Sequence, residues 1–130
     1  MRKIARETVF KLLFEHSFLN ERNTEGVELL MLADDFDDDD KAYIKATYDG
    51  VISTADSLKE KISAHLQNYR IERLYRPDLI VLMLATYELQ EQTAPHKVVI
   101  NEAVDLAKRY GTEKSGKFVN GVLANMIKTY

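Results

Sequence analysis

Basic side chains gather at both ends of the sequence, where they could bind a charged partner. Residues 1–11 carry four basic and one acidic side chain, and residues 108–130 carry five basic and one acidic side chain. Residues 21–40 carry nine acidic side chains and one basic one. The net charge of -3 therefore averages over a dipolar chain. Because lysine and arginine form charge-assisted hydrogen bonds with phosphate, the two ends favour a nucleic-acid partner.

The first basic cluster falls in the opening of a predicted helix, where the positive end of the helix dipole disfavours cations. Its members are Arg2, Lys3 and Arg6. An anion from outside the protein would explain this placement, and so would unselected surface charge. The second cluster, Lys114 and Lys117, precedes the ring of Phe118. If the last helix packs beside the first, cations and ring together suit single-stranded RNA, although Phe118 also fits the apolar stripe of its own helix.

Other chemistries have little support in the sequence. The chain has no cysteine, and His16, His65 and His96 lie too far apart in sequence to suggest a metal site. The run Asp37–Asp40 lacks the alternating ligands and central glycine of a calcium loop, so we interpret it as a solvated helix start. No glycine-rich phosphate loop or nucleophile motif occurs. We therefore expect neither an enzyme nor a metal protein.

Hydrophobic spacing predicts an all-α protein. The 130 residues are 45% hydrophobic, which is enough for one core, and we expect a single domain over 1–130 with no membrane-spanning segment. The stretch LIVLMLATYEL is apolar almost all round and predicts the buried central helix. Gly111 is expected to end one helix and Ser115 to cap the next. The predicted helices are 2–19, 27–33, 43–69 (one long helix or two in line), one starting near Pro77, 98–110 and one following Ser115.

The last third of the chain resembles the signature of the NusB family of bacterial transcription antitermination factors. The string PHKVVINEAVDLAKRYGTEKSGKFVNGVLANMI, from Pro95 to Ile127, matches it without gaps. The segments ARETVFKLLF and IERLYRPDLIVLMLATYEL also resemble helices of this family. Two residues depart from the family pattern: Met83 replaces an arginine that could pair with Glu88, and Tyr69 replaces a tryptophan.

The resemblance implies a compact bundle of about seven helices in two subdomains, located in the cytoplasm and without a cofactor. It implies binding to the boxA RNA of rRNA leader transcripts together with NusE, a small-subunit ribosomal protein, and assembly with NusA, NusG and RNA polymerase. By matching position, the expected RNA-binding residues are Arg2, Lys3, Arg6, Lys114, Ser115, Lys117, Phe118 and Asn120. The expected partner-binding residues are Phe14 and Asp78.

Two other interpretations remain open from the sequence. The N-terminal part of an rRNA cytosine methyltransferase family also resembles NusB, so the chain could be such a domain in detached form. That enzyme needs a further Rossmann-like domain, and we expect none, because the chain runs from Met1 to Tyr130 and ends just after its last helix. The apolar face of the last helix also allows a homodimer.

Overall fold

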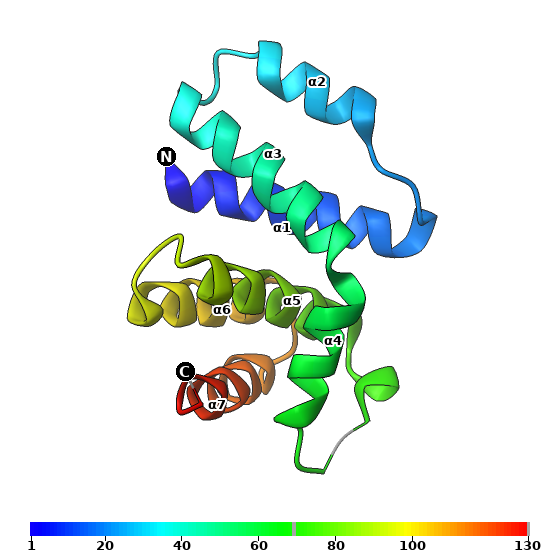
Figure 1. The fold of residues 1–130 in the computed structure, drawn as a ribbon, viewed down its shortest axis with the longest axis vertical. Coiled ribbons are helices and arrows are strands. Elements are labelled where there is room, and N and C mark those ends of the chain that lie inside the picture. Colours follow the sequence, from blue (N-terminus) through cyan, green and yellow to red (C-terminus); the bar gives the residue numbers. More distant parts are fainter. Residues whose placement is uncertain (69, 130) are drawn as a thin grey trace.

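The computed structural model describes residues 1–68 and 70–129. Within these residues the protein has seven α-helices, one short 3₁₀ turn at Ile71–Arg73 and no strand, which confirms the all-α prediction (Figure 1). The helices are α1 (Arg2–Leu19), α2 (Thr24–Leu32), α3 (Asp38–Ser53), α4 (Ala55–Ala64), α5 (Arg76–Glu91), α6 (His96–Tyr110) and α7 (Ser115–Ile127). None of the described helices has the length and apolar character needed to cross a bilayer.

The helix predicted over 43–69 is two helices, with a break at Thr54. The Thr54 hydroxyl donates a hydrogen bond to the Gly50 carbonyl, as does the Ser53 hydroxyl, and such local bonds compete with a continuous helix. The helix also starts earlier than predicted, because the Asp37 carboxylate accepts a hydrogen bond from the Asp40 amide and caps α3. Tyr69, which replaces the family's tryptophan and ends the predicted helix, lies outside the described residues.

Helix α5 is the centre of the bundle, as its apolar sequence predicts. It packs against α1 and α3 of one helix group, and against α4, α6 and α7 of the other (Figure 1). Eleven of its sixteen residues are buried, including every residue from Ile80 to Thr86. Pro77 stands in its first turn, where the missing N–H breaks no helical hydrogen bond.

In the link from α6 to α7, Gly111 ends α6 as predicted, but Ser115 does not cap α7. Gly111 has extended backbone angles, and its N–H donates to the Ala107 carbonyl. A Cβ on Gly111 would lie 2.3 Å from the Ser115 Oγ. The glycine is therefore required by the close approach of Ser115 and not by a left-handed backbone conformation. Ser115 is the first residue of α7 and does not cap it; its Oγ accepts a hydrogen bond from the Thr112 amide. These contacts hold the start of α7 tightly against the end of α6.

Candidate nucleic-acid interface

Carboxylates of the protein itself compensate the surface cations in the first turn of α1. The Arg2 Nε donates to the Asp40 Oδ1 at 2.9 Å, and the Met1 ammonium lies 2.8 Å from the other Asp40 oxygen. The ammonium and Arg2 together lower the pKa of Asp40. The Arg2 guanidinium also lies over the Tyr43 ring, 4.3 Å from its centroid. The acidic start of α3 thus supplies the anion that the helix dipole of α1 requires.

Lys3 faces α6. Its Nζ lies 3.2 Å from an Asp105 oxygen and 3.3 Å from a Glu102 oxygen, and these two carboxylates raise its pKa. The Lys3 side chain is still 47% exposed, and that of Asp105 is 51% exposed. Lys3 is therefore accessible to a phosphate, but it must exchange its present partners to bind one.

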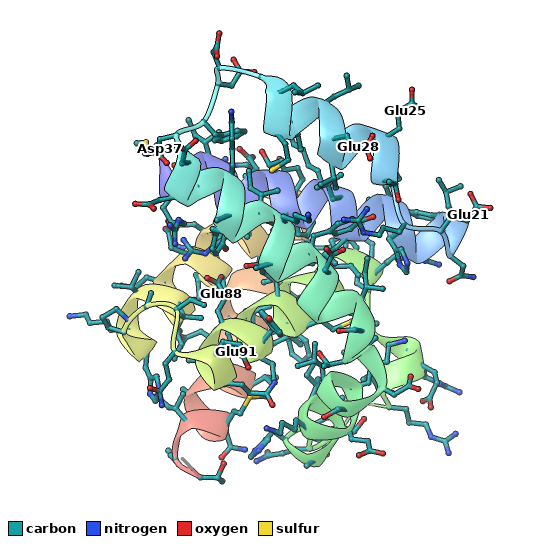
Figure 2. The ribbon with its side chains drawn as sticks, turned by 45° about the horizontal axis from the view of Figure 1, so that its top comes forward. Glu21, Glu25, Glu28, Asp37, Glu88 and Glu91 are labelled. Carbon is teal, nitrogen blue, oxygen red and sulfur yellow. The ribbon has the colours of Figure 1, made fainter. Side chains whose placement is uncertain are left out.

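Arg6 is not a surface residue, which corrects the expectation that it joins an exposed cluster. Its side chain is 5% exposed, and it donates from Nε and Nη2 to the two oxygens of Glu88 at 2.7 and 2.9 Å. Thr93 donates a further bond to Glu88. Figure 2 shows Glu88 within the bundle, whereas Glu21 and Glu25 project from its outer edge. This ion pair joins α1 to α5. Glu88, which could have paired with the arginine that Met83 replaces, thus has Arg6 as its partner.

The start of α7 carries a second group of polar side chains, whose lysines lack the carboxylate partners that Arg2 and Lys3 have. Lys114, Lys117 and Asn120 are exposed, and Phe118 is half-buried against the core. Neither lysine forms a salt bridge with any of the described residues. Ser115 is 1% exposed, so its expected direct contact with RNA does not fit this position. Lys114, Lys117 and Asn120 therefore offer two positive charges and one amide to a ligand.

A groove beside Phe118 adds residues that the sequence did not suggest. It has a volume of about 280 Å³ and lies between α7 and the segment 65–68 that follows α4. Its polar lining includes His65, Gln67, Asn68 and Asn125. The sequence analysis treated His65 as an isolated histidine. No sequence signal connects this segment with the last helix, because about fifty residues separate them and only tertiary packing brings them together.

The two expected partner residues lie at one corner, where the end of α1 meets the start of α5. Phe14 is half-buried between Phe10 and Phe18, with ring centroids 6.0 and 5.0 Å away. The Phe18 ring is exposed and stacks under the Arg76 guanidinium at 4.1 Å. Asp78 is only 7% exposed, and its contact with NusE stays a prediction. Burial raises its pKa, and the nearby Ser115 hydroxyl opposes that shift.

The two basic clusters do not meet in one pocket. Helix α1 runs antiparallel to α5, because Arg6 pairs with Glu88 near the end of α5 while Arg76 at its start bonds to the Ser17 carbonyl. The start of α7 lies near Asp78, at the opposite end of α5 from Glu88. Ten residues of helix span about 15 Å. In Figure 1, α5 and α6 separate α1 from α7. The candidate site is therefore two separate clusters, which lie near opposite ends of the bundle's central helix.

Comparison with known proteins agrees with this fold along its whole length. A family model described as the NusB family matches residues 2–128. The transcription antitermination protein NusB of Clostridium botulinum (strain Kyoto / Type A2) is 38% identical, over 97% of this chain and 99% of that relative.

Solved structures show the same likeness. T. maritima NusB is 37% identical with a TM-score of 0.89, covering 100% of this chain and 92% of that one. A chain from the crystal structure of antitermination factors NusB and NusE in complex with dsRNA is 32% identical with a TM-score of 0.85, covering 99% of this chain and 97% of that one. The fold is thus that of a class of helical transcription antitermination factors, which are not enzymes. The chain belongs to the NusB family.

Proposed function

We propose that this protein binds the boxA RNA of rRNA leader transcripts together with NusE, and that the pair joins NusA, NusG and RNA polymerase in the cytoplasm to suppress premature termination. The observation that carries the proposal is the likeness, along nearly the full chain, to a chain in the complex of NusB and NusE with dsRNA. Catalysis has no part in this role. The protein acts by holding RNA and a protein partner at the same time.

The side chains of the two clusters support RNA binding. Lys114 and Lys117 offer unpaired charge, Asn120 can donate to and accept from a base edge, and Arg2 and Lys3 can hold a more distant part of the strand. Since the clusters are separated along α5, an extended strand suits them better than a compact ligand. Arg6 contributes indirectly, by fixing α1 on α5 through Glu88.

The corner between α1 and α5 is the proposed NusE contact. Phe14 and Phe18 supply an aromatic surface there, and Arg76 supplies a charge over the outer ring. Aromatic residues and arginine are the side chains most enriched at the energetic centres of protein interfaces. Asp78, being buried, supports this corner from beneath.

Titration of fluorescent boxA RNA with the protein, in the presence and absence of NusE, tests the proposal. We expect specific binding that tightens when NusE is added, and weaker binding to a scrambled RNA. A Phe18→Ala variant should bind RNA alone normally and lose at least about fivefold of the NusE enhancement. Unchanged RNA affinity on adding NusE would contradict the adaptor role.

A further inference from the structure

A second groove, larger than the one beside Phe118, lies where the two helix groups meet. Its volume is about 340 Å³, within the range of about 300–1,000 Å³ that is typical of ligand pockets. Its walls come from the end of α1, the break between α3 and α4, the 3₁₀ turn Ile71–Arg73 and the first half of α5. Figure 1 shows these segments on the same side of the molecule. A ligand in this groove would therefore contact both helix groups at once.

The floor of the second groove is aliphatic. Its buried members are Leu13, Val51, Ile80 and Met83, none of which is more than 6% exposed. None of the described residues that line the groove is a phenylalanine, tyrosine or tryptophan, which are the usual partners for stacking a flat ring. Methionine adapts its shape to irregular apolar contacts. This lining favours a flexible aliphatic chain as the buried part of a ligand.

Charged side chains stand at the rim of the second groove, namely Lys59 of α4, Arg76 of α5 and Glu72 of the 3₁₀ turn. All three are exposed, and none forms a salt bridge with another of the described residues. His16 adds a ring that can be protonated. Cations therefore outnumber carboxylates at the rim, and its charge is complementary to a single negative group.

The guanidinium of Arg76 is held in place by the protein itself. Its Nη1 donates to the Ser17 carbonyl at 2.8 Å and to the Ser17 Oγ at 3.2 Å, and its central carbon lies 4.1 Å from the centroid of the Phe18 ring. Its Nε and Nη2 have no hydrogen-bond partner among the described residues. A guanidinium that is already fixed loses little freedom on binding, and it can donate two parallel hydrogen bonds to a carboxylate.

We propose that the second groove binds a free aliphatic carboxylate of medium chain length, with its hydrocarbon chain on the apolar floor and its carboxylate at the rim between Lys59 and Arg76. This site is separate from the two clusters that bind RNA. It is also separate from the aromatic surface that contacts NusE, because neither Phe14 nor Phe18 lines the groove. Because the ligand binds only where the two helix groups meet, it should stabilise the folded protein.

Calorimetric titration of the wild-type protein with carboxylates from butanoate to octanoate tests both the floor and the charge. Each added methylene should tighten binding about fourfold, and octanoate should bind with a Kd below about 1 mM. Octylammonium has the same chain and the opposite charge, and it should bind at least about tenfold more weakly than octanoate. Equal binding of these two ligands would overturn the proposal. So would an affinity that does not depend on chain length, or no binding of octanoate at millimolar concentration.

Two substitutions, each with a matched control, locate the site. Ala55→Leu adds a larger side chain to the wall of the groove and should weaken octanoate binding at least about tenfold, whereas Ser57→Leu on the exposed side of α4 should not change it. Lys59→Ala should weaken it about threefold, whereas Lys45→Ala, an exposed lysine outside the groove, should not. Equal effects of a variant and its control would place the carboxylate elsewhere and overturn the proposal. These titrations contain neither RNA nor NusE, so their failure would leave the proposed function intact.

Discussion

The first turn of α1 and the start of α7, with the residue before it, each carry two surface cations, but the neighbours of these cations differ. Arg2 and Lys3 are paired with carboxylates of α3 and α6, whereas Lys114 and Lys117 form no salt bridge among the described residues. The buried carboxylates near the two helix starts differ as well. The buried Glu88 near α1 has an arginine partner, and the buried Asp78 near α7 has an oxygen with no hydrogen-bond partner in the described structure. The two pairs of cations carry the same charge in the sequence. The pair on α1 binds carboxylates of the protein itself, whereas the pair at the start of α7 is available to a ligand.

Breaking the buried pair should have the largest effect. Arg6→Ala leaves Glu88 charged, buried and without its cation, so we expect unfolding free energy to fall by about 3 to 5 kcal/mol. Chemical denaturation measures this, with Arg2→Ala as the control. Arg2 is more exposed, and its loss should lower stability by less than about 1 kcal/mol. A stable Arg6→Ala protein that has lost RNA affinity would show instead that Arg6 contacts RNA.

Replacing Asp78, whose buried carboxylate has one oxygen without a hydrogen-bond partner among the described residues, should change the unfolding free energy less and in the opposite direction. Asp78→Asn removes a buried charge, and we expect a gain of about 1 kcal/mol in unfolding free energy at pH 7. Burial raises the pKa of Asp78 in the folded protein, so the charge destabilises the fold above that pKa and not below the unfolded value of about 3.9. The advantage of the asparagine variant should therefore shrink as pH falls from 7 towards 4. An advantage that is independent of pH would contradict this explanation.

Removing one of the two carboxylates that pair with Lys3 should have the smallest effect. Asp105→Asn removes one of the two carboxylates that face Lys3, and we expect RNA affinity to rise about twofold at low salt. The same substitution at Asp56, an exposed acid in the first turn of α4, is the matched control and should change little. If Asp105→Asn leaves RNA affinity unchanged while Lys3→Ala lowers it, Lys3 binds RNA without first leaving Asp105.

The sequence predicted the helices well because each one carries a local apolar period and local end signals. The site was predicted less completely, since burial depends on partners far away in the chain. Arg6 has the same side chain as Arg2, but it pairs inside the bundle with Glu88, 82 positions later, and with Glu102. Ser115 was expected to bind RNA and Asp78 to bind the partner, and both side chains are buried where α5 meets α7. The groove residues of segment 65–68 could not be predicted from spacing at all.

The most direct test measures boxA RNA affinity against salt for the double variants Lys114→Ala/Lys117→Ala and Arg2→Ala/Lys3→Ala. A Lys45→Ala/Lys59→Ala protein controls for lost charge elsewhere on the surface. Four phosphate contacts predict a wild-type slope of log K against log salt near -3, taking about 0.7 per contact. The α7 double variant should lose the most affinity and flatten the slope by about 1.4, and the α1 double variant should change less on both counts. A larger loss from the α1 pair, with the α7 pair behaving like the control, would contradict the account.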